Sequence, residues 1–298
     1  MQDEPVDELP PERVSELLRR HWEIEASEVR YAPVGRGSHH WIAGDSRAPA
    51  WFITADRLSC GRFAELSASA QTARHLANEG CDFVLAPIPD RTNTLVRTVQ
   101  SGWAMQVLPY LRGWSTDQGA FTDPHEQREI AHMVGRVHAV APPTAVPRWD
   151  PTPLYRSEIE SALHNLDRPW PQARYAEQTR AVLTKNRTHV QDLLDEYDAL
   201  LAAITQDCDP WVLTHGEPDS DNVVRTDNGH MYLIDWTSVA IAPRERDLFD
   251  VLQGPADVMT AYQQAAGPHN ARPAAMTMIG LYWRLSHLGH DVKRLRRS

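Results

Sequence analysis

The sequence has 298 residues, 42% of them hydrophobic, and a formal net charge of −10 at pH 7. This length and composition suit a globular protein, while the acidic balance argues against nucleic-acid binding, which normally brings a basic stripe. No uncharged apolar run is long enough to cross a bilayer, the first residues lack the pattern of a signal peptide, and the three cysteines show no metal-ligand spacing. We therefore expect a cytoplasmic protein without membrane or nucleic-acid partners.

The first third of the chain has the pattern of a sheet with helices. A short amphipathic helix is predicted over 10–22, with Pro11 in its first turn. Short apolar runs separated by Gly, Asp and Pro then predict strands, and Gly80 ends a second helix over 64–80. The predicted strands cover residues 29–34, 39–43, 50–55, 82–89, 93–99 and 102–110.

After residue 110 the hydrophobic periodicity becomes mostly helical. Helices are predicted over 123–140, 178–204 and 273–297, and only the stretch 213–238 interrupts them, with two strands. The change predicts an α+β bilobal chain. A small antiparallel-sheet lobe would cover 1–109 and a larger, mainly helical lobe 110–298, with a tight hinge near 109–113.

The stretch LTHGEPDSDNVVRTDNGHMYLIDWTS, residues 213–238, gathers polar side chains between two apolar strands. His215, the acid Glu217 two residues later and Asn222 five beyond that reproduce the spacing of the kinase catalytic loop. Asp235 ends an apolar strand, where kinases carry a metal-binding Asp. A match of this kind occurs by chance in many chains, and an Asp at a strand end is often only a turn residue.

Four further motifs follow the order of a kinase-like chain. They are VGRGS at 34–38, VLPYLRG at 107–113, MVGRVHA at 133–139 and PRERDL at 243–248. With them, the chain resembles the aminoglycoside phosphotransferase and choline kinase-like family over most of its length, and leans towards the spectinomycin phosphotransferase-like members. The resemblance implies a protein-kinase-like fold and transfer of the γ-phosphoryl of ATP or GTP to a hydroxyl of a small molecule.

The resemblance also implies roles for single residues. Asn222 and Asp235 would bind Mg²⁺, which takes one or two carboxylates together with phosphate oxygens. Glu217 would accept the proton of the attacking hydroxyl, His215 would brace the loop, and Asp247 would hold the loop from below. The nucleotide would contact the Gly-rich loop and the hinge through Gly35, Arg36, Gly37, Ser38, His39, Leu108 and Tyr110.

Two positions depart from the family pattern. Glu217 stands where most members have Asp, and a misplacement of about 1 Å can cost on the order of a hundredfold in rate. Thr54 stands at the third-strand position of the usual lysine, and no lysine precedes Lys185. A phosphate contact must then come from backbone N–H groups or another cation. The candidate cations are Arg36, His39, His40 and Arg57.

Two classes of function therefore remain open on the sequence. The departures at Thr54 and Glu217 favour a pseudokinase-like binding or sequestering protein without transfer. The presence of both Asn222 and Asp235 favours an enzyme, because a non-catalytic descendant is under no chemical pressure to keep two metal ligands at this spacing.

The expected partner is a hydroxylated, cationic small molecule, such as an aminoglycoside, an aminocyclitol or a nucleoside antibiotic. Residues 150–178 contain acids and aromatic side chains, and acids complement amines while aromatic faces attract cations. Any helical lobe carries such residues, so a purely structural role stays open. Asp219 and Asp221 are expected to be solvent-facing loop charges. Antibiotic resistance or self-protection is the expected purpose.

Overall fold

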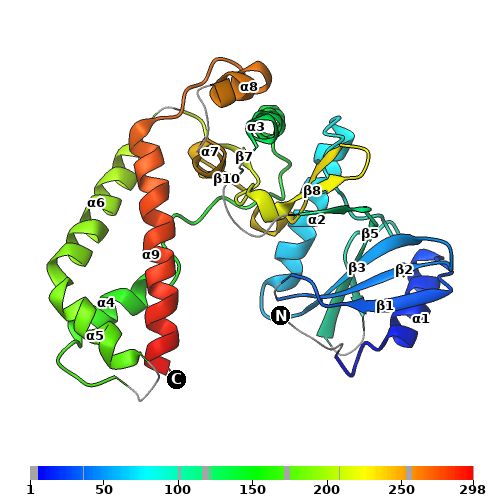
Figure 1. Cartoon of the computed structure of the whole chain (residues 1–298), viewed down its shortest axis with the longest axis horizontal. Helices are drawn as coiled ribbons and strands as arrows, with labels where there is room; N and C mark the ends of the chain where they lie inside the picture. Colours follow the sequence, from blue (N-terminus) through cyan, green and yellow to red (C-terminus); the bar gives the residue numbers. More distant parts are fainter. Residues whose placement is uncertain are drawn as a thin grey trace.

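The computed structural model describes residues 6–35, 37–99, 102–115, 121, 123–170, 175–207, 209–252 and 257–297. Within these ranges an antiparallel sheet with two helices forms one lobe, and helices with two small sheets form the other (Figure 1). The predicted α+β class, with an amino-terminal antiparallel sheet and a mainly helical remainder, is confirmed.

The first lobe is built on a five-stranded sheet with the order β1-β2-β3-β5-β4. Its strands are β1 Glu28–Ala32, β2 His39–Gly44, β3 Pro49–Arg57, β4 Arg97–Val99 and β5 Trp103–Pro109. Successive side chains of a strand point to opposite faces. The face that includes Ile53 and Ala55 forms a buried core with Leu17 and Leu18 of α1, Pro11–Trp22.

The opposite face of the sheet, which we call the inner face, carries Phe52, Thr54 and Asp56. Asp56 lies opposite Ala104 of β5, and Ala104 packs with Leu66 of α2, Arg62–Asn78. Helix α2 therefore covers the inner face, while α1 covers the outer one.

The second lobe is mainly helical. Its helices are α3 Pro124–Ala139, α4 Arg156–His164, α5 Ala176–Lys185, α6 Arg187–Gln206, α7 Glu245–Val251, α8 Asp257–Ala266 and α9 Pro273–Arg297. Its strands are β6 Gly113–Trp114, β7 Val212–Thr214, β8 Val223–Thr226, β9 Met231–Leu233 and β10 Ala240–Ala242. Helices α4, α5, α6 and α9 lie on the side away from the first sheet, and α3, α7 and α8 lie nearer to it (Figure 1). No helix in the described ranges has the length and apolar character needed to span a membrane.

Three predicted elements were wrong in detail. The helix expected over 178–204 is divided into α5 and α6 at Asn186, whose side chain donates to the carbonyl of Val182 instead of leaving the helix continuous. Residues 82–89 form no strand beyond a single bridge from Val84, since Pro87 and Pro89 have no N–H to donate to a ladder. The stretch 213–238 contains β8, β9 and the end of β7, one strand more than expected.

The two lobes share backbone bonds and a core. The amide of Leu233 in β9 donates to the carbonyl of Phe83 (2.8 Å), and one buried cluster contains Leu76 of α2 together with Val134 of α3 and Trp236. Between the lobes, the predicted boundary at 109/110 falls after β5 and before β6, which pairs with β8 of the second lobe.

Candidate active site

The loop of residues 215–222, called the catalytic loop from here on, joins β7 to β8. One hydrogen bond closes the loop on itself and another joins it to the residue after β9. The Asn222 side-chain amide donates to the carbonyl of Glu217 (2.9 Å), and the amide of Ile234 donates to the carbonyl of Asn222 (2.9 Å). Asp235 follows Ile234 directly. Glu217, Asn222 and Asp235 are therefore brought to one place from two strands.

The carboxylate of Asp247, at the start of α7, holds the catalytic loop from inside the lobe. It is fully buried and accepts the amides of His215 and Gly216, both at 2.7 Å, and the Nε2–H of His138 (3.1 Å). Burial alone would raise the pKa of Asp247, but the hydrogen bond from His138 and the charge of Arg246 hold that pKa below its ordinary value. Asp247, which was expected to support the loop, thus accepts hydrogen bonds from two consecutive loop amides.

His215 is completely buried and links the catalytic loop to the strand before Asp235. Its Nε2–H donates to the carbonyl of Ile234 (2.9 Å), and its Nδ1 accepts the amide of Glu217 (3.3 Å). Its ring meets Trp236 edge-on, with centroids 4.6 Å apart. Burial lowers the pKa of His215, which suits an imidazole that accepts at one nitrogen and donates at the other.

Gly216 occupies a position that no other residue fits. Its φ is +105°, and a Cβ at this position would lie 2.5 Å from the guanidinium nitrogens of Arg246. That buried arginine donates to the hydroxyl of Thr214 (3.0 Å) and the carbonyl of Ser238 (2.9 Å). Arg246 therefore packs directly under the catalytic loop, a role that the sequence motif did not indicate.

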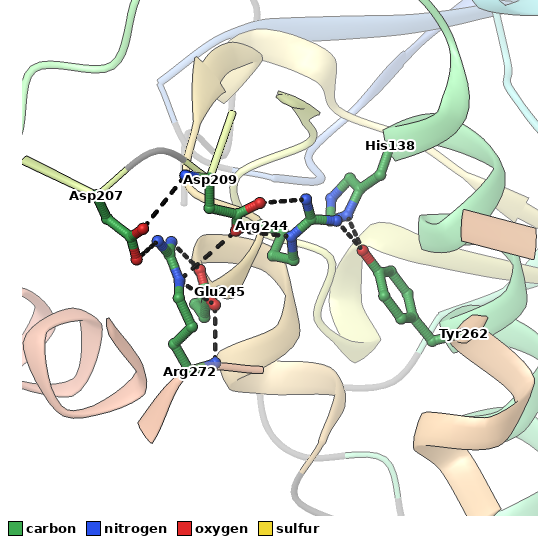
Figure 2. A network of polar contacts seen from close by, with 7 residues as sticks. All are labelled: His138, Asp207, Asp209, Arg244, Glu245, Tyr262 and Arg272. Atoms are coloured by element: carbon green, nitrogen blue, oxygen red, sulfur yellow. Dashed lines mark hydrogen bonds and ion pairs between the residues drawn. The ribbon is translucent and has the colours of Figure 1, made fainter. Parts of the chain in front are cut away.

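A second polar network fixes α7 to the surrounding helices (Figure 2). Tyr262 of α8 bonds His138 (2.9 Å), the residue that donates to Asp247, and also accepts from Arg244 (3.2 Å). Arg272, before α9, pairs with Glu245 (2.9 Å). The other members of the network are Asp207 and Asp209, which pair with Arg272 and Arg244. Buried charges that are paired in this way fix the orientation of α7, and with it that of Asp247.

Asn222 and Asp235 present oxygen atoms that fit a small hard cation. The Asn222 amide nitrogen is used within the loop, which orients its Oδ1 outward. Asp235 is exposed and has a left-handed backbone (φ +59°, ψ +71°), a costly conformation for a non-glycine residue that is typical of functional sites. Within the described ranges no cluster of three or more His, Cys, Asp or Glu could hold a metal by itself. A Mg²⁺ bound by two protein oxygens and completed by phosphates and water fits these residues.

Glu217 lies half-buried beside these ligands. Its pKa is raised, first by burial and then by the negative charge of Asp235, while the cation of Arg246 and a hydrogen bond with Ser238 act in the opposite direction. A carboxylate with a raised pKa is a better proton acceptor near neutral pH than an exposed one. The environment of Glu217 therefore suits a general base, despite its extra methylene.

Asp219 and Asp221 are not the solvent-facing charges that we expected. Both are partly buried, and an Oδ1 atom of each is buried without a hydrogen-bond partner among the described residues. Burial and a hydrogen bond with Asp221 raise the pKa of Asp219 to about 8, and burial raises the pKa of Asp250, on α7, to about 6. Sequence reasoning missed Asp250, although it lies one helical turn beyond Asp247 and Arg246.

In the first lobe, the residues of the Gly-rich loop separate into two groups. Gly35 and Gly37 both have left-handed backbones (φ +70° and +87°), and the Ser38 hydroxyl donates to Asp56 on the inner face (3.0 Å). His39 lies on the other face, buried in the α1 core and bonded to Tyr31 (2.9 Å). The structure therefore places His39 away from the rest of the predicted site. Arg36 lies outside the described residues.

The predicted hinge contacts lie at the end of β5. Leu108 is opposite Phe52 of β3, so it shares the inner face, and the amide of Tyr110 donates to the carbonyl of Ala50 (2.9 Å). Thr54 has Gln106 on one side and His40 on the other, with no basic residue in the usual lysine position.

The sequence matches the phosphotransferase enzyme family over residues 28–276. No curated protein sequence is significantly similar to the chain.

The chain is also similar to solved structures of phosphotransferases. A spectinomycin phosphotransferase in complex with ADP and spectinomycin is 16% identical, with a TM-score of 0.78 over 97% of this chain and 90% of that one. A macrolide 2′-phosphotransferase from Brachybacterium faecium is 18% identical (TM-score 0.58, 96% and 92% covered). An APH(2″) protein in complex with GDP and kanamycin is 14% identical (TM-score 0.62, 95% and 92% covered). These likenesses confirm the predicted bilobal, protein-kinase-like fold.

Proposed function

The chain belongs to the phosphotransferase enzyme family, and from this premise we propose that Glu217, Asn222 and Asp235 form the centre at which a phosphoryl group passes from a nucleoside triphosphate to a hydroxyl of a small molecule. The observation that carries the proposal is the pair of hydrogen bonds that holds Asn222 to both the Glu217 and the Ile234 backbone. They hold Glu217, Asn222 and Asp235 close together, an arrangement that would suit a base and two metal ligands in phosphoryl transfer.

Each of these residues has a distinct task. Glu217 would orient the attacking hydroxyl and take its proton. Asn222 and Asp235 would hold a Mg²⁺ ion, which when bound neutralises charge on the phosphates. His215 and Asp247 contact neither ligand in this scheme; they keep the loop in the geometry that the chemistry needs. Positioning of this kind accounts for most of the catalysis in phosphoryl transfer.

The nucleotide would lie between the Gly-rich loop and the end of β5. Gly35, Gly37 and Ser38 would contact the phosphates, since glycines with left-handed backbones let the chain approach them closely. Leu108 and Tyr110 would contact the base. Similar structures contain ADP or GDP, so ATP and GTP are both suitable donors.

The acidic side chains beside the catalytic loop suit a cationic acceptor. Asp219, Asp221 and Asp250 lie near Glu217, and two of their oxygens lack partners in the described part of the chain. An amine of the acceptor would offset their mutual repulsion. Similar structures contain spectinomycin and kanamycin, and we propose an aminocyclitol or aminoglycoside as the acceptor and antibiotic inactivation as the purpose. A cytoplasmic location fits the free thiols of Cys60 and Cys81.

The test is transfer itself. The purified protein would be incubated with Mg²⁺, ATP or GTP, and a panel of aminocyclitols, aminoglycosides and nucleoside antibiotics, and the products would be examined by mass spectrometry for an added phosphoryl group. We expect at least one acceptor to gain it and the Asp235→Ala variant to transfer none. If the protein binds Mg²⁺ and nucleotide and yet no acceptor gains a phosphoryl group, the pseudokinase-like alternative replaces this proposal.

A companion experiment addresses the acceptor site. Asp219→Asn should weaken binding of an amine-bearing acceptor, measured by calorimetry, while leaving Mg·ADP affinity unchanged. Asp227→Asn, on the exposed turn between β8 and β9, is the matched control. If the native protein, Asp219→Asn and Asp227→Asn bind the acceptor equally well, the acidic side chains do not belong to the acceptor site.

A further inference from the structure

The inner face of the first sheet must supply positive charge if nucleotide phosphates bind beside it. Several negative charges of a triphosphate approach the Gly-rich loop, and backbone N–H groups alone offset only part of them. Thr54, flanked by His40 and Gln106, has no charge to offer. The cation has to reach this face from another element.

Three other arginines near the sheet bind partners away from Thr54. Arg57 pairs with Glu8 (3.1 Å) on the α1 side, and it shares that side with Ile53 because the two are four residues apart on one strand. Arg97 pairs with Asp90 in a buried turn, and Arg74 donates to a loop carbonyl. None of these three guanidinium groups faces Thr54.

Arg62, the first residue of α2, is placed differently. Its Nη2 contacts the carboxylate of Asp56 at 2.7 Å, and the same carboxylate oxygen accepts the hydroxyl of Ser38 in the Gly-rich loop at 3.0 Å. The Asp56 side chain is 7% exposed and that of Arg62 is 29% exposed, so the acid is buried and the base is open to a ligand. The Arg62 side chain makes one further bond among the described residues, a long one to Glu65 (3.4 Å), which leaves guanidinium N–H groups available.

This pair has the reverse polarity of the usual kinase pair. In kinases a lysine on the third strand meets a glutamate of the following helix. Here an acid on the third strand, Asp56, meets a base on the following helix, Arg62. The same two elements are joined, but the cation comes from the helix.

His40 lies on the inner face beside Thr54, under the Gly-rich loop. Its ring stacks on Phe52 at 5.1 Å, and its Nδ1 has no hydrogen-bond partner among the described residues. A Cβ on Gly35 would lie 3.2 Å from its Nε2, so the Gly-rich loop passes over it. Burial lowers the pKa of His40, and the negative charges of Asp56 and, more weakly, Asp235 act in the opposite direction. Both carboxylates are therefore close enough to the ring to affect it.

We propose that Arg62 binds the nucleotide phosphates in place of the absent third-strand lysine, and that Asp56 positions it. The proposal rests on the nucleotide site proposed above. A guanidinium held on one edge by a carboxylate keeps its other edge free for two parallel bonds to phosphate oxygens, which a lysine cannot make. The buried acid also restricts the arginine to rotamers that point along the inner face.

Calorimetry with Mg·ADP and with adenosine tests the role of Arg62, with Mg·GDP and guanosine used instead if the enzyme prefers GTP. In Arg62→Ala and in Arg62→Gln, affinity for Mg·ADP should fall about tenfold or more, as expected for loss of a charge-assisted contact, while adenosine affinity stays within about twofold. Arg57→Ala, which removes the neighbouring strand arginine from the opposite face, should change neither. Arg62→Lys should recover part of the lost Mg·ADP affinity.

The outcomes separate the two proposals. If the native protein binds no nucleotide, the proposed function fails and this inference with it. If the native protein binds Mg·ADP and Arg62→Ala binds it equally well, or loses ADP and adenosine affinity together, Arg62 has no phosphate contact and the inference alone is overturned.

A double-mutant cycle tests the positioning role of Asp56. Asp56→Asn keeps an oxygen that can accept the Ser38 hydroxyl and removes the charge that pairs with Arg62. It should therefore reduce Mg·ADP affinity in the native background and have no further effect in Arg62→Ala. An equal loss in both backgrounds would mean that Asp56 does not act through Arg62.

Discussion

At the catalytic loop three donors converge on the fully buried carboxylate of Asp247, whereas on the inner face of the first sheet one partly exposed arginine meets the carboxylate of Asp56. The carboxylate of Asp247 is fully buried and bonded within the protein, so it is not accessible to a ligand. The arrangement on the inner face leaves N–H groups of Arg62 and the Nδ1 of His40 without partners among the described residues. We infer that the support of the proposed catalytic residues is fully bonded before a ligand arrives, while the residues proposed to lie beside the phosphates are not.

The largest expected effect on stability is that of a substitution at Asp247, which supports the catalytic loop. Asp247→Asn would leave one of the two loop amides facing a donor, and it would remove a negative charge that acts on buried Arg246. We expect a loss of about 3–5 kcal/mol in unfolding free energy, measured by urea denaturation, and loss of transfer activity. Asp257→Asn, at an exposed ion pair with Arg128, should cost less than about 1 kcal/mol. Equal costs for the two variants would contradict the comparison.

A substitution at Gly216 should have the next largest effect on stability. Gly216→Ala would bring a methyl group to 2.5 Å from Arg246 at a φ of +105°, so we expect a loss of about 2–4 kcal/mol and a large fall in activity. Gly229→Ala has a similar positive φ (+81°) with nothing within 4 Å, and should cost about 1 kcal/mol with activity retained. Thermal unfolding of the pair separates the clash from the backbone strain.

On the inner face, Arg62→Ala should have a small effect on folding. Its ion pair is partly exposed and Asp56 keeps the Ser38 hydroxyl, so we expect about 1 kcal/mol or less. The variant would then show a near-native unfolding midpoint in urea together with its loss of nucleotide affinity. A loss as large as that of Asp247→Asn would show that this region, too, is a structural support.

The pH dependence of the contribution that Asp247 makes to stability should be the smallest effect across the neutral range. The pKa of Asp247 is depressed in the folded protein, so its stabilising contribution is complete above the unfolded value of about 3.9 and is lost as pH falls through the lower folded value. The gap in thermal stability between the native protein and Asp247→Asn should therefore stay constant from pH 7 to about 5 and shrink below about 4. A gap that closes between pH 7 and 6 would contradict a depressed pKa.

The sequence indicated which residues of the catalytic loop lie close together because their spacing is local. His215, Glu217 and Asn222 lie within eight residues, and the resemblance supplied Asp247 and Asp235. The sequence did not predict how Arg246 packs under Gly216, since that contact depends on the orientation of a buried helix.

The first lobe was harder to predict, because strand register decides which face a side chain occupies. His39 and His40 are adjacent, and a shift of one residue would exchange them between the α1 core and the inner face. Arg62 was not considered as a phosphate contact because it belongs to a helix eight residues beyond Thr54. Only the packing of that helix shows that it reaches the strand.

The bond from Leu233 to Phe83 has a consequence for motion of the two lobes. It joins the first lobe to β9, two residues before Asp235, so the lobes are pinned together at one edge. We expect the two lobes to open and close by rotating about this edge. The Gly-rich loop around Gly35 and Gly37 would then move farthest, and the proposed metal ligands Asn222 and Asp235 would hardly move. Hydrogen exchange at the Leu233 amide should accordingly be slow with and without nucleotide, while exchange in the Gly-rich loop should slow only when nucleotide binds.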